Sequence, residues 1–320
     1  TTLIVDNIRT QEASPNHTFF TSQGLKIVEM QASELKEKML LPSNLLNKPA
    51  VGEKEVMLDT NIEYDKRRKD TYTLPEVLSP ELAEFVGYYV GDGHKSSDFA
   101  LRLTDSSVQL LEHHKELVKK IFNYDAVIRH HPDKSKNAHI LEVANIKAIK
   151  FIERNFPEAM LKTRFKVVPQ KILAAPLAVQ AGFIRGLADA DGTIVNSVKI
   201  TSFSRALLEG LQHVFSSLGI PSNINYKDNS VCLASKFSIA KFHEKIGFAS
   251  TEKQRKLEAK ANSFAEKDFD HMSLVPITPL DLRNILKDAG MLGRVHNSPK
   301  LSEILSMGLL DLFRRKSGYA

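Results

Sequence analysis

The chain has 320 residues, a formal net charge of +6 and one cysteine. This length can bury a substantial core and hold more than one domain, and the ordinary apolar and charged content excludes disordered and fibrous classes. The single Cys232 excludes an internal disulfide and a cysteine-based zinc site, which favours a cytoplasmic location. No apolar run reaches the roughly 20 residues that cross a bilayer, and no secretory signal is visible at the start. The positive charge favours polyanionic partners such as nucleic acid.

Residues 1–70 form a flanking segment that precedes the repeats described below. This segment contains Ser14-Pro15-Asn16-His17 and then Gly24-Leu25-Lys26-Ile27-Val28. It resembles part of an intein splicing domain, in which a T-x-x-H element would correspond to Ser14 to His17. The chain has no cysteine at its start and no His-Asn pair at its end, so we expect no self-splicing, and His17 can equally be structural. The basic cluster 66–69 follows. It can either bind phosphate or be an ordinary solvated run of charged residues.

An internal duplication is the strongest feature of the chain. Residues 85–93 read FVGYYVGDG and residues 184–192 read IRGLADADG, with glycine and aspartate at matching positions. Further matches follow in the same order, including 110–112 with 207–209 and 162–164 with 253–255. A constant order at a nearly constant offset indicates a duplicated unit of about a hundred residues.

Each copy is predicted to fold as helix, two strands, helix, two strands, helix. In the first copy Ser79 and Pro80 begin a helix that runs to about Asp92, and Gly93 and Gly192 are expected to end the two motif helices in the left-handed conformation. The later elements of the first copy are a strand at 98–104 with Phe99, Leu101 and Leu103 on one face, a helix at 106–122, a hairpin at 127–143 and a helix at 146–155. The second copy has a helix from Pro176, a strand at 197–201, a helix at 204–218, a hairpin at 224–233 and a helix at 238–247.

The two motif helices carry small residues four positions apart, Gly87 with Gly91 and Gly186 with Ala190. Residues at this spacing share a helix face, so two such faces allow the helix backbones to approach closely. Close packing would compensate the roughly 1 kcal/mol that a mid-helix glycine costs relative to alanine. The alternative is that the glycines are kinks without a packing role.

Close pairing of these helices would place Asp92 and Asp191 side by side at two helix C-termini. The two carboxylates would repel each other and would face the negative ends of the helix dipoles. A Mg²⁺ ion relieves both effects and suits phosphodiester hydrolysis. We therefore predict that Asp92 and Asp191 bind metal, with the preceding Gly91 and Ala190 as further metal contacts. A single aspartate beside a glycine is more often a turn former.

At these residues the sequence resembles the LAGLIDADG homing endonucleases of the single-chain, two-motif type. The resemblance covers about residues 78–258; residues 186–192 match the motif closely, whereas 88–91 depart from it. It implies a monomer with internal pseudo-twofold symmetry, sheets that lie over the major groove, cleavage of both strands of a long specific DNA site, and Mg²⁺ on the last motif aspartates.

The resemblance also implies one lysine in each half near the cleavage centre. Lys162 and Lys253 are the preferred catalytic pair because both begin a repeated Lys-x-Arg element. Lys166 and Lys256 are close rivals, and any of the four can instead be a solvated surface lysine.

The polar faces of the predicted sheets supply candidate DNA contacts, because strands fit the major groove and Arg, Lys and Asn contact bases or phosphates there. These candidates are Arg102, Thr104, Arg129, His130, His131, Lys134, Lys136 and His139 in the first copy, and Lys199, Thr201, Asn225 and Lys227 in the second. The histidines at 130, 131 and 139 also allow a zinc interpretation, which the absence of nearby cysteine disfavours. Asp189 can assist the site, although a structural role on its helix is the preferred interpretation.

The sequence thus predicts an α+β fold of two pseudo-symmetric αββαββα repeats, at 71–170 and 171–265. Residues 266–320 are predicted to form a helical extension that either packs on the core or acts as an accessory DNA-binding arm. Three functions remain open: a Mg²⁺-dependent site-specific endonuclease, a nucleic-acid-binding maturase or regulator without cleavage, and a fragment of a protein-splicing intein.

Overall fold

The computed structural model describes residues 2–5, 9–23, 26–36, 39, 54–63, 72–96, 99–130, 137–264 and 287. The chain divides into two compact units, one of residues 1–5, 10–43 and 267–320 and the other of 6–9 and 44–266. The basic cluster 66–69 and, apart from residue 287, the predicted extension 266–320 lie outside the described residues. Within the part of the chain that is described, no helix is both long enough and apolar enough to cross a bilayer.

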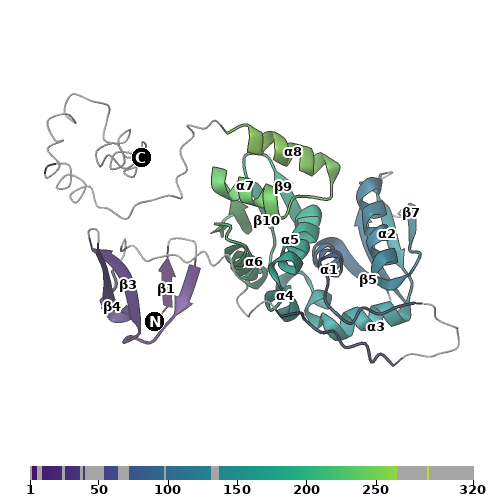
Figure 1. Ribbon diagram of the computed structural model, residues 1–320, viewed down its shortest axis with the longest axis horizontal. Helices are drawn as coiled ribbons and strands as arrows, with labels where there is room; N and C mark the ends of the chain where they lie inside the picture. The colour runs from purple at the N-terminus through teal and green to yellow at the C-terminus, as the bar shows by residue number, and fades with distance from the viewer. Residues whose placement is uncertain are drawn as a thin grey trace. The chain divides into compact units, whose positions relative to one another are not determined.

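The first unit contains two pairs of strands, of which β3 and β4 are antiparallel (Figure 1). β1 (Thr2–Val5) pairs with β2 (Arg9–Glu12), and β3 (Thr18–Gln23) pairs with β4 (Lys26–Gln31), which the short 3-10 helix η1 (Ala32–Glu34) follows. Between the two pairs, the backbone N–H of His17 donates to the carbonyl of Ser14 at 3.0 Å. The Ser14–His17 segment is therefore a turn.

The second unit contains the two predicted repeats. The elements of the first are α1 (Pro80–Asp92), β5 (Gly93–Ser96), β6 (Ala100–Asp105), α2 (Val108–Phe122), β7 (Val127–His130), β8 (His139–Val143) and α3 (Ile146–Asn155). The elements of the second are α5 (Leu177–Asp191), β9 (Gly192–Ile194), β10 (Val198–Thr201), α6 (Arg205–Ser217), β11 (Asn223–Asn225), β12 (Ser230–Leu233), α7 (Lys236–Lys245) and a further helix α8 (Thr251–Asn262). The connection between the repeats contains η2 (Pro157–Met160), η3 (Thr163–Phe165) and α4 (Gln170–Leu173). The αββαββα order predicted from the sequence is confirmed in both copies.

The sheets of the two repeats have the same topology. The strand order is β5-β6-β8-β7 in the first and β9-β10-β12-β11 in the second, with antiparallel neighbours in each. In each repeat the second helix, α2 or α6, packs on the sheet through a buried apolar stripe. Residues 54–63, which the sequence assigns to the flanking segment, pack on the first repeat: the backbone N–H of Asp59 donates to Asn155 Oδ1 at 2.9 Å.

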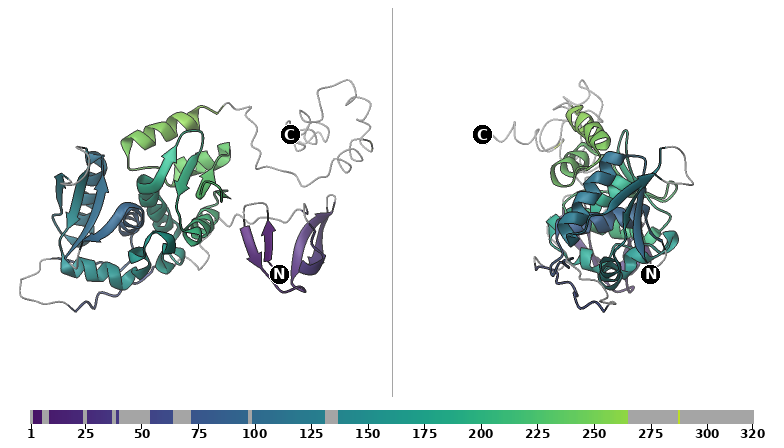
Figure 2. Two further views of the ribbon diagram at one scale, coloured as in Figure 1. Left: turned by 180° about the vertical axis from the view of Figure 1, so that it is seen from behind. Right: turned by 90° about the vertical axis from the view of Figure 1, so that its right-hand side faces the viewer.

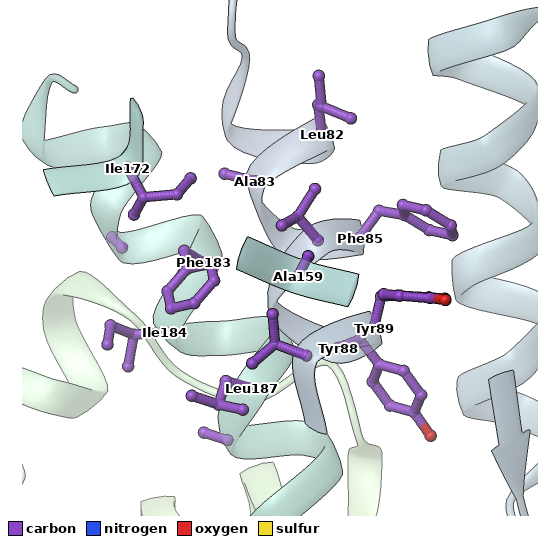
Figure 3. Packing of buried hydrophobic residues seen from close by; sticks show 14 of the residues in the cluster. Leu82, Ala83, Phe85, Tyr88, Tyr89, Ala159, Ile172, Phe183, Ile184 and Leu187 are labelled. Carbon is purple, nitrogen blue, oxygen red and sulfur yellow. The ribbon is translucent and has the colours of Figure 1, made fainter. Parts of the chain in front are cut away.

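The two motif helices α1 and α5 pack directly against each other at the centre of this unit (Figures 1 and 2). A Cβ added at Gly87 would lie 2.1 Å from the carbonyl oxygen of Phe183, and one added at Gly186 would lie 1.9 Å from that of Glu84. Ordinary van der Waals contact requires well over 3 Å, so only glycine permits this backbone approach. The predicted packing role of these glycines is therefore confirmed, and Figure 3 shows Phe183 and Leu187 beside α1 in the surrounding core.

The expected left-handed ends of the motif helices are wrong. The φ angles of Gly93 and Gly192 are −81° and −91°, and both residues are extended. The physical reason is that each helix passes directly into the first strand of its sheet. Glycine is required because a Cβ would lie 2.4 Å from the carbonyl oxygen of Tyr89 or 2.2 Å from that of Ala188.

The predicted strand 98–104 also needs correction at its start. Phe99 is 65% exposed, because β6 begins only at Ala100, whereas Leu101 and Leu103 are buried against the core as expected.

Candidate metal and nucleic-acid site

The last residues of α1 and α5 meet where the two sheets begin. Asp92 ends α1 and is exposed, while Asp191 ends α5 and is partly buried. A Cβ added at Gly91 would lie 2.4 Å from the Ala190 Cβ and 3.3 Å from Asp191 Oδ2, so the helix ends are in contact. The absence of a side chain at Gly91 therefore leaves room for the Asp191 carboxylate between the two helix termini.

The two aspartates interact electrostatically. Burial, followed by the negative charge of Asp92, raises the pKa of Asp191 from 3.8 to about 6. The positive charges of Lys166 and Lys253 oppose this rise without cancelling it. The folded chain therefore holds negative charge in a place where a cation would be stabilised.

Two lysines reach the C-terminal ends of the motif helices. Lys166 Nζ donates to the carbonyl of Gly91 at 2.8 Å, and Lys253 Nζ donates to the carbonyls of Ala188 at 3.1 Å and Asp189 at 2.5 Å. A cation at a helix C-terminus binds the last carbonyls of the helix and interacts favourably with the helix dipole; the carbonyl of Ala188 also accepts the backbone N–H of Gly192, so it is shared between two donors. Burial lowers the pKa of Lys253, while nearby carboxylates, Asp189 first, oppose the change.

The structure brings Lys166, rather than the preferred Lys162, to the matching position in the first repeat. Lys162 is exposed at the start of η3 and forms no side-chain hydrogen bond or ion pair within the described residues, and Lys256 is exposed and paired with Glu252 at 2.6 Å. The two lysines of the repeated Lys-x-Arg element have different surroundings because the chain takes different routes in the two copies. The first passes through η3 before its lysine, whereas the second enters α8 directly.

The two carboxylates are oxygen donors of the kind that divalent cations take in proteins. No group of three or more His, Cys, Asp or Glu side chains within the described residues is arranged to hold a metal. A cation between the helix ends would have Asp92 and Asp191 as its carboxylate ligands, and the rest of its coordination would come from water and substrate oxygens. Of the two predicted backbone contacts, the carbonyl of Gly91 already accepts the Lys166 ammonium, and Ala190 packs its Cβ toward Gly91.

Two further acids near the site have structural partners. Asp189 is 1% exposed and accepts hydrogen bonds from the backbone N–H groups of Ala249 and Ser250. Asp105, which no sequence motif singles out, accepts a 2.6 Å hydrogen bond from the buried Tyr88 hydroxyl. The position of Asp105 in the repeat could have identified it, because Ser202 is the matching residue of the second repeat. The side chains of both residues accept the backbone N–H of the residue two positions later.

The first sheet presents a polar face opposite its core face. Arg102 and Thr104 alternate along β6 with buried leucines. Arg102 donates to Glu142 Oε2 at 2.6 and 2.8 Å, and the exposed Arg129 lies 3.9 Å from the other carboxylate oxygen. The structure thus brings two of the predicted basic residues together around one carboxylate.

The predicted histidine cluster is partly described. His130 and His139 are paired across β7 and β8 with ring centroids 5.4 Å apart. His131, Lys134 and Lys136 lie outside the described residues, so the structure leaves the zinc interpretation of this cluster as a prediction.

The second sheet has a corresponding polar face. Lys199 and Thr201 alternate along β10 with buried apolar residues, and Thr201 lies opposite Ser230 in β12. Asn225 ends β11, and Lys227 is exposed in the following turn. Asp228 lies 3.6 Å from Lys199 Nζ and accepts a 2.8 Å hydrogen bond from Asn225, so this acid organises the polar face.

A match to a family model decides what the second repeat is. The LAGLIDADG-like domain matches residues 178–247, which run from α5 through α7. The second repeat is a LAGLIDADG-like domain.

Two curated proteins are similar to this chain over a larger part of its length. The glutamine–fructose-6-phosphate aminotransferase of Methanocaldococcus jannaschii is 27% identical over 82% of this chain and 24% of its own length. A subunit of the A-type ATP synthase of Pyrococcus abyssi is 27% identical over 68% of this chain and 21% of its own length. The chain therefore spans about a quarter of the length of these relatives or less.

Among solved structures, that of I-DmoI in complex with DNA and Mn is similar at 20% identity, with a TM-score of 0.38. The similarity covers 53% of this chain and 97% of that one.

Proposed function

We propose that this chain is a DNA endonuclease that hydrolyses phosphodiester bonds with a divalent cation, Mg²⁺ in the cell, held by Asp92 and Asp191. The observation that carries the proposal is the convergence of two acids and two lysines at the ends of one closely packed helix pair. Each repeat contributes one acid and one lysine, which suits the two strands of a duplex.

The lysines have a defined part in this chemistry. A bound cation would supply Lewis acidity toward a phosphate and lower the pKa of water. Each ammonium has three donors; Lys166 uses one on the carbonyl of Gly91, and Lys253 uses two on the carbonyls of Ala188 and Asp189. The remaining donors would stabilise negative charge that develops on a phosphate.

The two polar sheet faces supply the DNA-binding surface in this proposal. Each begins one residue after a site aspartate, because β5 follows Asp92 and β9 follows Asp191. Arg102, Arg129 and Lys199 provide positive charge on these faces. Contacts of this kind to phosphates and base edges hold and read a duplex.

A cleavage assay tests the proposal. Supercoiled plasmids that carry a randomised insert are incubated with the full chain in Mg²⁺ or in EDTA, and the cut sites are sequenced. Asp92→Asn and Asp191→Asn are expected to lower the cleavage rate by more than about 100-fold while DNA binding persists. Glu252→Gln, an acid-to-amide exchange at an exposed ion pair on α8, serves as the control.

Cleavage that continues in EDTA, or in both asparagine variants, would contradict the assignment of the site. Specific binding without cleavage by the wild-type chain would instead support the binding-only function of a maturase or regulator.

One observation favours a protein-splicing element as the setting of this chain. Segments similar to it make up 24% and 21% of two relatives whose names denote unrelated activities, which is the pattern of an inserted element. Expression of the complete open reading frame that contains this sequence, followed by mass spectrometry, should then reveal an excised fragment and joined flanking segments; a single uncut product would contradict this setting.

A further inference from the structure

Asp189 has a different environment from the site aspartate two residues later. Its side chain is 1% exposed, and its two carboxylate oxygens accept the backbone N–H groups of Ala249 at 2.8 Å and Ser250 at 3.0 Å. Ser250 is the N-cap of α8, and its hydroxyl accepts the N–H of Lys253. The Asp189 carboxylate therefore holds the backbone at the point where the helix that carries Lys253 begins.

Three further side chains hold the same segment, residues 246–251, which we term the lysine bracket. Arg185, one turn before Asp189 on α5, donates to the carbonyl of Ile246 at 2.7 Å. Gln254 accepts the N–H of Phe248 at 2.9 Å. Gln109, from α2 of the other repeat, donates to the carbonyl of Ala249 at 3.2 Å and accepts the N–H of Thr251 at 3.3 Å.

The bracket fixes the position of a long, flexible side chain. Lys253 lies in the first turn of α8, and its ammonium returns to the carbonyls of Ala188 and Asp189 on α5. Backbone and ammonium are thus both anchored to the last turn of one helix. An anchored backbone limits the space that the four-carbon stem can sample, and small displacements of a catalytic group reduce rates strongly.

The first repeat holds its lysine in another way. Val90 occupies the position that matches Asp189 and has no polar group to offer. There the carbonyl of Lys166 accepts a 2.5 Å hydrogen bond from the hydroxyl of Ser204, on the second repeat. The two lysines therefore have supports of different chemistry.

We propose that Asp189 is a positioning residue that holds the lysine bracket and thereby places Lys253 at the cleavage centre. Asp189 does not position Lys166, the lysine of the first repeat. This inference rests on the proposed endonuclease function. It predicts an effect on one half of the site, because the second repeat has a carboxylate at this position where the first repeat has Val90.

The test is strand-resolved, single-turnover cleavage of a plasmid site selected from the randomised library. Asp189→Asn should slow the nicking of one strand by about 10- to 100-fold, the cost typical of removing a partner that orients a reactive group. Nicking of the other strand should change less than about threefold. Gln109→Ala should slow the same strand to a smaller degree, and Glu252→Gln should be without effect.

A double variant separates positioning from general destabilisation. If Asp189 acts through Lys253, adding Asp189→Asn to Lys253→Met should cause no further loss. Equal slowing of both strands, or losses that multiply in the double variant, would overturn the proposal, as would wild-type rates in Asp189→Asn.

Hydrogen exchange supplies a measurement that does not depend on cleavage. The amides of Ala249 and Ser250 should exchange faster in Asp189→Asn, while amides in the core of α5 should keep their protection. If the wild-type chain cuts no DNA, the endonuclease proposal fails and the role of Asp189 in the bracket is decided by exchange alone. Unchanged exchange at both amides would refute that role.

Discussion

The contact between α1 and α5 predicts a specific cost for adding one methyl group. In Gly186→Ala the new Cβ would lie 1.9 Å from the carbonyl oxygen of Glu84 and 2.7 Å from the backbone nitrogen of Tyr88. Both obstacles are backbone atoms of a buried helix, so neither can move away alone, and the two helices must separate by about 1 Å or more to restore normal contact.

The expected magnitude follows from two opposed terms. Overpacking of a well-packed core costs about 1 to 3 kcal/mol, and a backbone clash belongs at the upper end. The higher helix propensity of alanine stabilises the helix by about 1 kcal/mol relative to glycine. We therefore expect Gly186→Ala to lower the free energy of unfolding by about 2 kcal/mol and the melting temperature by about 4 to 8 °C.

Urea unfolding and thermal melts of the full chain would measure this loss. The matched control is Gly210→Ala on α6, where the nearest atom to the new Cβ is the Cγ2 of Val168, a side-chain atom, at 2.8 Å. There the gain in propensity should largely offset the contact. Our account of the helix contact would be refuted if Gly186→Ala were as stable as the wild type, or less affected than Gly210→Ala.

Three further predictions concern the site. The pKa of Asp191 is raised to about 6, so the contribution of this carboxyl group to folding stability is highest below about pH 4 and is lost as the pH rises through 6. In EDTA, Asp191→Asn should therefore raise the melting temperature of the protein at about pH 7.5 and leave it unchanged at about pH 4. An equal shift of the melting temperature at both pH values would contradict the burial of this charge. Lys166→Met should lower the cleavage rate by about 100-fold, whereas Lys162→Met should cleave within about threefold of the wild type; the reverse order in single-turnover assays would restore the sequence-based choice. Arg102→Ala and Lys199→Ala should each reduce the slope of log Kd against log salt by about 1 in DNA-binding titrations, and unchanged slopes would remove these residues from the phosphate contacts.

The repeated sequence determined the architecture of the second unit. Local signals are strong there: the Ser79 hydroxyl caps α1 as predicted, accepting the N–H of Leu82 at 3.2 Å, and buried leucines alternate with polar residues along β6. The duplicated glycines indicated that each motif helix packs closely against another helix, and the matching motif helix was the simplest candidate. The same pairing placed Asp92 and Asp191 together from the sequence alone.

Only the tertiary structure decided which lysines join the two acids and how they are held. Lys166 reaches the end of α1, although it lies outside the repeated Lys-x-Arg element, because the chain between the repeats follows its own path through η3. From the sequence, Asp189 is expected to have a structural role on its own helix. In the fold its carboxylate instead accepts hydrogen bonds from the backbone of Ala249 and Ser250, in a distant segment of the chain. The physical reason is common to both cases. Sequence periodicity reports which face of an element is buried, whereas hydrogen bonds between distant segments depend on the paths of the intervening loops.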